Sequence, residues 1–396
     1  MMNILTSPLE LYCHLAYHPT IMVFSLMSRL EKITAYPIAV PLRTPMKLAS
    51  ESIEVAENLI VHIIDSDGVE GWGEAASAPT MTGETLPGMV AAVERFISPA
   101  LLGQRVEDIE ALGKILHRSI RANSGAKAAV DIALHDLVAK RGGVPVHMLL
   151  GAHGHRKIPV IRMISPAEPS VLAERVREAT EAGYSHFKLK VGACVRNDAT
   201  NVALVREVAG TASHLSADAN MGWTVEEARD FLAHVADFGL AYLEQPVPDD
   251  DVEGMVKIAD ASSIPLCIDE ALHSPEDVIV HARAKAATGV GIKLIKLAGY
   301  AGAVAVEKLA RASGWNTTYA SKIAETSIGG AATLHAAALA TTVDWGVSIT
   351  TQYLDGDVVT KPVAIKNGMA EVFLEPGLGV AIDRASLDRY RLDIRY

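Results

Sequence analysis

The sequence predicts an α/β protein in which an α+β domain precedes a barrel of alternating strands and helices. Two observations predict this. Strands come before helices in the first part of the chain, and short apolar runs alternate with helical stretches from Lys157 onward. The length of 396 residues allows a large barrel with a smaller second domain, and a composition of 49% apolar and 21% charged residues is typical of a globular protein.

The α+β domain is expected over residues 27–152. Residues 1–26 contain no Lys or Arg, so they lack the basic region of a secretory signal and are expected to form a disordered extension. The β-rich runs, bounded by Pro and Asp-Gly turn signals, cover residues 33–42, 57–66 and 69–75. The stretches with apolar residues at helical spacing cover residues 85–103, 106–120 and 126–143.

The barrel is expected over residues 153–355. Its apolar, strand-like runs cover residues 158–164, 186–192, 214–220, 240–247, 265–271, 290–296, 316–322 and 345–350. A helical stretch lies between each consecutive pair, so the strands should be parallel and should close into a ring. This predicts a modified TIM barrel of the (β/α)7β type, with residues 356–396 returning to pack on the first domain.

Charge and cysteine usage exclude several classes of function. The formal net charge of −11 argues against a nucleic-acid partner. The three cysteines, Cys13, Cys194 and Cys267, are too few and too scattered for a disulfide framework or a zinc site, which suits a reducing cytoplasm. No run of 18 or more uncharged apolar residues is present, so no membrane span is expected.

Charged side chains recur at the ends of consecutive barrel strands, where the catalytic residues of such barrels lie. In strand order these residues are Lys188 and Lys190, Asp218 and Asn220, Glu244, Asp269 and Glu270, and Lys293. The three main acids are 26 and 25 residues apart, which is one strand–helix unit each. They should therefore converge on one rim of the barrel.

Three converging carboxylates repel one another unless a cation lies between them, and all-oxygen ligation suits Mg²⁺. Lys190 and Lys293 flank this centre, and an ammonium near other cations can lose its proton near neutral pH. Lys188 lies on the same strand face as Lys190 and is expected to lower its pKa. A single carboxylate at a strand end is more often a helix cap, and Glu270 is either such a cap or a partner for a lysine.

The motifs FKLKVG, SADAN, YLEQPV, CIDEA, GIKLIKLAG and EPGLGV occur in this order. In combination they resemble the enolase superfamily, specifically its muconate-lactonizing subgroup, over about residues 32–385. The resemblance implies a capping domain over the barrel and Mg²⁺ bound by Asp218, Glu244 and Asp269. It also implies abstraction of the proton α to a substrate carboxylate, with Lys190 and Lys293 as acid and base on opposite faces. A small-molecule carboxylate substrate and a homo-oligomer are implied as well.

Within that subgroup, the first domain is most similar to the dipeptide epimerases. Those enzymes carry Asp-x-Asp after the eighth strand to hold the substrate ammonium, whereas this chain has Tyr353 and retains only Asp355. One extra residue lies near Ser321–Glu325, where Glu325 is expected to support the site. Glu51 replaces an Arg of the Ala-Glu epimerases. It either contacts the distal part of the substrate, favouring a cationic group, or points into solvent.

Three functions remain open at this point. The first is epimerisation or racemisation of a dipeptide or N-acyl amino acid. The second is muconate-type cycloisomerisation, which closes a lactone ring. The third is a non-enzymatic, metal-dependent barrel that binds a small anion.

Overall fold

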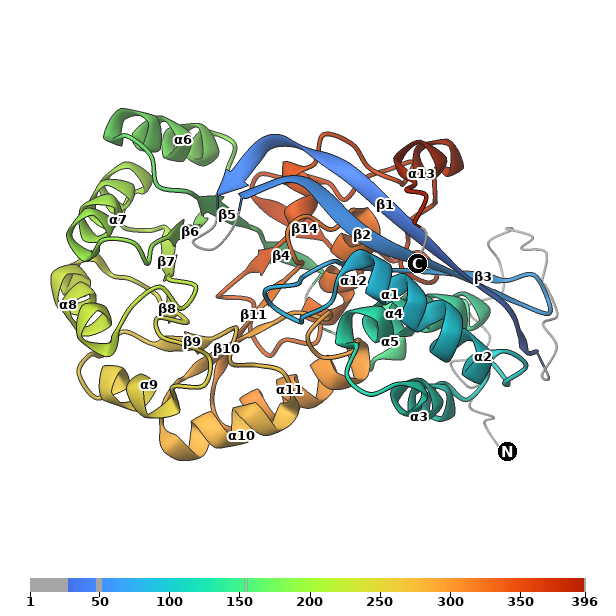
Figure 1. Ribbon diagram of the computed structural model, residues 1–396. Helices are drawn as coiled ribbons and strands as arrows, with labels where there is room; N and C mark the ends of the chain where they lie inside the picture. Colours follow the sequence, from blue (N-terminus) through green and yellow to red (C-terminus); the bar gives the residue numbers. More distant parts are fainter. Residues whose placement is uncertain (1–27, 48–51, 153, 155, 395–396) are drawn as a thin grey trace, which may run out of the picture.

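The chain folds into a capping domain beside a strand–helix barrel (Figure 1). The structure is a computed structural model that describes residues 28–47, 52–152, 154 and 156–394. The extension expected at residues 1–26 lies outside the described residues. No helix in the described ranges is both long enough and apolar enough to cross a membrane.

The capping domain consists of a three-stranded antiparallel sheet covered by helices. Its strands pair in the order β1 (Leu30–Lys47), β2 (Ser52–Asp65) and β3 (Glu70–Ala76), at the three predicted places. Its helical elements are α1 (Leu86–Ala92), the π-helical turn η2 (Val93–Ile97), α2 (Ser98–Leu101), α3 (Ile109–Ser119), α4 (Ser124–Arg141) and α5 (Val146–Leu149). The predicted helix at 85–103 is thus a continuous run of three helical elements, and the short α5 was not predicted.

Helix α4 is buried between the cap sheet and the barrel. A Cβ on Gly73 of β3 would lie 2.0 Å from the carbonyl oxygen of Ala129 in α4, so only glycine allows the strand and the helix to approach this closely. On the barrel side, the backbone N–H of Tyr300 donates to Asp131 of α4 at 2.7 Å. Helix α4 therefore couples the cap to the barrel.

The barrel contains all eight predicted strands and all seven predicted helices. The strands pair in parallel in chain order: β5 (Ile161–Ile164), β6 (His186–Lys190), β7 (His214–Asp218), β8 (Leu243–Glu244), β9 (Leu266–Ile268), β10 (Gly289–Ile292), β11 (Asn316–Ala320) and β12 (Val347–Ser348). The helices outside them are α6 (Pro169–Glu181), α7 (Val195–Ala209), α8 (Val225–Val235), α9 (Val252–Ala259), α10 (Pro275–Ala284), α11 (Tyr300–Ala312) and α12 (Ser327–Ala337). A parallel bridge between Val160 and Val347 joins the first strand to the eighth and closes the ring.

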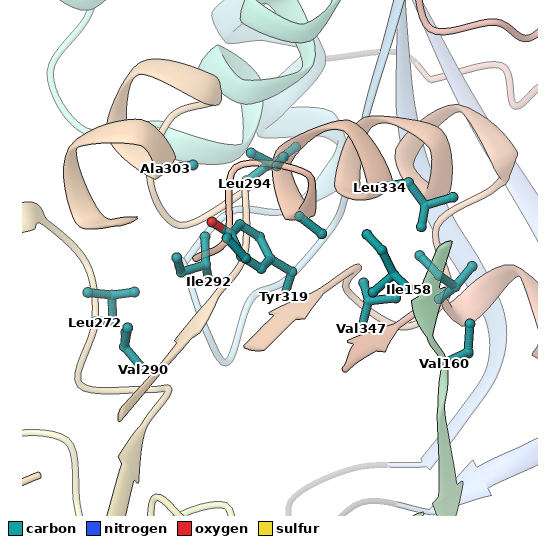
Figure 2. Packing of buried hydrophobic residues seen from close by; sticks show 14 of the residues in the cluster. Ile158, Val160, Leu272, Val290, Ile292, Leu294, Ala303, Tyr319, Leu334 and Val347 are labelled. Atoms are coloured by element: carbon teal, nitrogen blue, oxygen red, sulfur yellow. The ribbon is translucent and has the colours of Figure 1, made fainter. Parts of the chain in front are cut away.

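The strands alternate between side chains that face the ring interior and side chains that pack against the helices. Figure 2 shows Ile292 of β10 and Tyr319 of β11 side by side on the side of the strands that carries α11, and Val290 of β10 beside Leu272. The hydroxyl of Tyr319 donates to Glu307 of α11 at 2.7 Å, which confirms its outward direction. The alternate positions, which include Lys188 and Lys190 of β6 and Asp218 of β7, consequently face inward.

The first predicted barrel strand is divided between two sheets. Its start, β4 (Lys157–Pro159), pairs antiparallel with β14 (Met369–Glu371), which pairs in turn with β13 (Ile365–Lys366). Only the continuation, β5, belongs to the ring. The rest of the C-terminal segment reaches the cap, where α13 (Arg384–Tyr390) is followed by the hydrogen bond from Leu392 N to Pro37 O at 2.8 Å.

Candidate active site

Five neighbouring strands, β6 to β10, bring their carboxyl ends to one rim of the barrel. Lys190 is paired in register with Asp218, and Asp218 with Glu244, so these three side chains lie on strands about 4.8 Å apart. Asp269 follows β9 directly, and Lys293 follows β10. The structure therefore brings the lysines and carboxylates selected from the sequence into one cluster.

Each of the three carboxylates is buried and contacts a lysine. Asp218, Glu244 and Asp269 are no more than 3% exposed. Lys190 Nζ lies 2.6 Å from Asp218 Oδ2, and Lys188 Nζ lies 2.5 Å from Glu244 Oε2. Lys293 Nζ contacts Asp269 Oδ2. These ammonium groups supply the positive charge that three buried carboxylates require.

Burial and ion pairing act in opposite directions on these groups. For Asp269, burial is outweighed by Lys293 and Lys296, which hold its pKa well below the ordinary value. For Asp218, burial is similarly outweighed by Lys190 and Lys188, and the pKa is lowered. Burial dominates at Glu244 and raises its pKa to about 7, although Lys188 opposes the shift. Asp269 is consequently the most firmly ionised of the three.

The lysines differ in access to the barrel mouth. The side chains of Lys190 and Lys293 are each 13% exposed, whereas those of Lys188 and Lys296 are 6% and 0% exposed. Burial alone would lower the pKa of Lys293, but the Asp269 carboxylate outweighs it, and the pKa of this lysine is raised. Lys190 and Lys293 therefore carry the two more exposed ammonium groups of this cluster.

Lys188 lies on the same strand as Lys190, but its charge is paired. Its ammonium is paired with Glu244, and this pairing outweighs burial and raises the pKa of Lys188 well above the ordinary value. Lys188 is therefore neutralised by Glu244 and is not the free neighbouring charge that the sequence analysis expected beside Lys190.

Lys296 is a member of the cluster that the sequence analysis missed. Its ammonium donates to Asp269 Oδ1 at 2.6 Å and also to the backbone carbonyl of Asp269. Gln245 supports the same residue, because its Oε1 accepts from the backbone N–H of Asp269 at 3.1 Å. The motif GIKLIKLAG could have indicated this second lysine, because Lys296 follows Lys293 by only three residues.

Asn220 and Glu270 form a polar chain that ends on Lys190. Lys190 Nζ donates to Asn220 Oδ1 at 2.8 Å, and Asn220 Nδ2 donates to Glu270 Oε1 at 2.9 Å. Burial raises the pKa of Glu270, and the nearby Asp269 and Asp218 carboxylates add to the shift. Of the two interpretations of Glu270, these contacts support that of a partner for a lysine, reached through Asn220.

Three other predicted site residues have no described contact with the cluster of lysines and carboxylates. Glu325 is buried between the domains, where it accepts from the backbone N–H of Ala76 at 3.4 Å and of Lys322 at 3.2 Å. Asp355 is exposed, and its backbone N–H donates to Pro41 O in β1 at 2.9 Å. Glu51 lies outside the described residues.

The donor set is of the kind that a hard divalent cation uses. Asp218, Glu244 and Asp269 offer carboxylate oxygens only, from three adjacent strands, and their charges require compensation. Among the residues that the structure describes, no three His, Cys, Asp or Glu side chains are already arranged as a metal centre. The residues present thus fit Mg²⁺ by chemistry and strand position, and the lysine contacts of the carboxylates would have to change on binding.

Comparisons with known proteins agree with this geometry. Residues 32–151 match the family model "Mandelate racemase / muconate lactonizing enzyme, N-terminal domain", and residues 171–386 match "Enolase C-terminal domain-like". The L-Ala-D/L-Glu epimerase of Bacillus subtilis is 32% identical over 362 residues, which cover 89% of this chain and 96% of the relative. The N-succinyl-L-Arg/Lys racemase of Bacillus cereus is 32% identical over 310 residues, covering 77% and 84% respectively.

A solved structure extends the likeness to three dimensions. The dipeptide epimerase of Cytophaga hutchinsonii, complexed with Mg and the dipeptide D-Ala-L-Val, superposes with a TM-score of 0.86 at 26% identity. The match covers 91% of this chain and 98% of that protein. The cap, the ring of strands and the cluster of carboxylates and lysines at its rim thus lead to one conclusion: the chain belongs to the mandelate racemase/muconate lactonizing enzyme family of the enolase superfamily, and it is an isomerase of that superfamily.

Proposed function

We propose that this isomerase is a Mg²⁺-dependent epimerase or racemase that moves the α-proton of a dipeptide or N-acyl amino acid. The observation that carries the proposal is the position of the two accessible lysines. Lys190 ends β6 and Lys293 follows β10, and these strands are four strands apart in either direction around the closed ring of eight. Lys190 and Lys293 therefore approach the centre from opposite sides, as inversion of a carbon atom requires.

The residues of this chain divide into two groups. Lys190 and Lys293 exchange protons with the substrate α-carbon, one on each face. The buried Lys188 and Lys296 hold Glu244 and Asp269, and the chain from Glu270 through Asn220 orients the ammonium of Lys190. Water is restricted at this centre because the carboxylates are almost fully buried, which strengthens each electrostatic contact.

Asp218, Glu244 and Asp269 would hold Mg²⁺. When bound, the metal would stabilise the negative charge that develops on the substrate carboxylate as the α-proton leaves. Activity is expected to disappear after EDTA treatment and to return when Mg²⁺ is added. Isothermal titration should detect Mg²⁺ binding that is weakened in Asp218→Asn. Full activity of the metal-free protein would overturn this part of the proposal.

The substrate is best identified by α-proton exchange. The chain is incubated in D₂O with libraries of dipeptides and N-acyl amino acids, and deuterium incorporation is followed by mass spectrometry. Exchange into both epimers of one compound class is the expected result. Asp355 and Glu51 are proposed substrate contacts, so Asp355→Asn and Glu51→Gln should each raise KM more than they lower kcat.

Muconate-type cycloisomerisation is the second candidate. It is favoured by Tyr353, which stands where the dipeptide epimerases carry the first Asp of their ammonium-binding pair. Loss of muconate absorbance without α-proton exchange of any amino-acid derivative would reverse the order of the two candidates. A barrel that only binds anions would show neither reaction.

A further inference from the structure

The loop that carries Lys293 is buried between the capping domain and the barrel. This loop, which we call the Lys293 loop, runs from Lys293 after β10 to Gly299 before α11. Leu294 belongs to the larger apolar cluster around the barrel strands (Figure 2), whereas Ile295 belongs to the apolar core of the capping domain. Among the described residues, Ile295 is the only buried member of that second core that comes from the barrel. The Lys293 loop therefore packs into the cores of both domains.

Helix α11 has no side chain of its own that accepts from its first backbone N–H groups. Gly299 occupies the N-cap position, and the first turn contains no acidic residue. Asp131 of α4, in the capping domain, supplies the missing acceptor, because its Oδ2 accepts from the backbone N–H of Tyr300 at 2.7 Å. A carboxylate at this position pairs a free donor and compensates the partial positive charge of the helix N-terminus. The capping domain thus fixes the end of the Lys293 loop.

The contact between α4 and the Lys293 loop is close and buried. A Cβ on Gly299 would lie 2.2 Å from Asp131 Oδ2, so the carboxylate lies directly against the backbone of the loop. One turn further along α4, the ring of His135 meets the ring of Tyr300 edge-on, with the ring centres 5.0 Å apart. Asp131 is 3% exposed. Water therefore cannot replace the carboxylate if it is removed.

The loop that follows the other lysine is held from within the barrel. Lys190 ends β6, and Asp198 of α7 binds the segment that follows. Its Oδ2 accepts from three backbone N–H groups at 3.0–3.1 Å, those of Gly192, Ala193 and Cys194. Both lysines are thus followed by a loop that a buried carboxylate holds. For Lys190 this carboxylate belongs to the barrel, and for Lys293 it belongs to the capping domain.

We propose that Asp131 is a positioning residue for Lys293, so that the capping domain controls proton transfer on one face of the substrate and not on the other. This inference rests on the proposed function. Lys293 is held by β10 on one side and by a turn on the other, in which the backbone N–H of Lys296 donates to the Lys293 carbonyl at 3.2 Å. A misplacement of about 1 Å can cost a catalytic group about 100-fold in rate. Loosening the loop should therefore slow Lys293 and spare Lys190.

The test measures α-proton exchange in D₂O for both epimers of a substrate. Lys293→Ala first identifies the epimer whose proton Lys293 removes, because exchange of that epimer is lost. Asp131→Ala should lower kcat for the same epimer by about tenfold with little change in KM, and should leave the other epimer within about twofold of wild type. Asp131→Asn keeps an oxygen that can accept from the Tyr300 N–H, so it should restore most of the rate.

Two further aspartates provide the controls. Asp108 is exposed and accepts from the backbone N–H of Ala111 at 2.9 Å, at the start of α3 in the same domain. Asp108→Ala should therefore leave both exchange rates unchanged. Asp198→Ala removes the carboxylate that holds the loop after Lys190, so it should slow exchange of the opposite epimer.

Equal loss for both epimers in Asp131→Ala, or loss for neither, would overturn the proposal. If Asp131→Ala does not fold, Ile295→Val tests the packing of the same loop, and Ile97→Val, at another buried position of the same core, is its control. Ile295→Val should slow exchange of the Lys293 epimer severalfold more than that of the other, and Ile97→Val should not. The same epimer ratio in both valine variants would contradict the proposal.

Amide hydrogen exchange, resolved to single residues by mass spectrometry, separates this inference from the proposed function. If no compound exchanges its α-proton, the proposed function fails. The turn after Lys293 is closed by the backbone N–H groups of Lys296, Leu297 and Gly299. Exchange of these amides that is about threefold or more faster in Asp131→Ala than in wild type and Asp108→Ala then still supports the positioning of the loop. Unchanged protection of all three would contradict it.

Discussion

Replacing Lys296 by methionine tests how the cluster of buried charges is held together. Lys296→Met keeps the length of the side chain and removes its ammonium. The native ammonium is fully buried and donates to both Asp269 Oδ1 and the Asp269 carbonyl. In the variant, both acceptors lose their donor in a site where water cannot replace it.

The expected cost follows from the remaining contacts of Asp269. Breaking a buried ion pair by removing one partner costs about 3–5 kcal/mol, because it leaves a charge without compensation. Lys293 still contacts Asp269 Oδ2, so the carboxylate keeps one of its two ammonium partners. We therefore expect the lower end, a loss of about 3 kcal/mol in the free energy of unfolding.

Urea-induced unfolding, followed by tryptophan fluorescence, measures this loss. Lys308→Met on α11 is the matched control: Lys308 is exposed, so its replacement should change the free energy of unfolding by less than about 0.5 kcal/mol. If Lys296→Met is as stable as this control, the reasoning about buried compensation is refuted.

Two further predictions concern the contact between cap and barrel. Gly73→Ala would place a Cβ 2.0 Å from the Ala129 carbonyl oxygen. The melting temperature should therefore fall by several degrees, and limited proteolysis should cleave the cap faster than in wild type. An unchanged melting temperature would contradict the close approach. Burial, with Glu74 nearby, raises the pKa of Glu325 from 4.5 to about 8, so the folded state binds more protons than the unfolded state between these values. The free energy of unfolding should fall as pH rises from about 4.5 to about 8, and Glu325→Gln should reduce this slope; an equal slope in both proteins would argue against it.

The barrel could be predicted from the sequence because its signal is local and repeated. Eight short apolar runs are separated by seven helical stretches, and such a regular alternation has few alternative arrangements. The division of the first strand could not be predicted in this way. Lys157–Pro159 pairs with β14 in a different sheet. Because β14 lies some two hundred residues further along the chain, the sequence pattern of the strand does not reveal this partner.

The candidate site was predictable to the extent that it depends on strand ends. Asp218, Glu244 and Asp269 converge because parallel strands end at the same rim. The pairing of each carboxylate with a particular lysine was not predictable, since it depends on how far each side chain reaches toward the neighbouring strands. Glu325 shows the same limit: its sequence position follows a barrel strand, but its hydrogen bonds include one to the cap.

The cap–barrel contact near Glu325 involves three buried polar groups from distant parts of the chain. Glu74 of β3 accepts from the backbone N–H of Thr326 at 2.8 Å and of Gly329 at 2.7 Å, at the start of α12. Asn58 of β2 donates to the Ala324 carbonyl at 3.0 Å. These bonds join residues more than 250 positions apart, so spacing along the chain carries no trace of them.

Face-specific proton exchange tests the central claim most directly. Once a substrate is known, each of its two epimers is incubated in D₂O with Lys190→Ala and with Lys293→Ala, and deuterium at the α-carbon is measured. Because the lysines lie at the ends of strands on opposite sides of the ring, each variant should lose epimerisation and retain exchange with one epimer only. The retained epimer should differ between the two variants. Complete loss of exchange with both epimers in both variants, or retention of the same epimer in both, would contradict catalysis by two lysines on opposite faces.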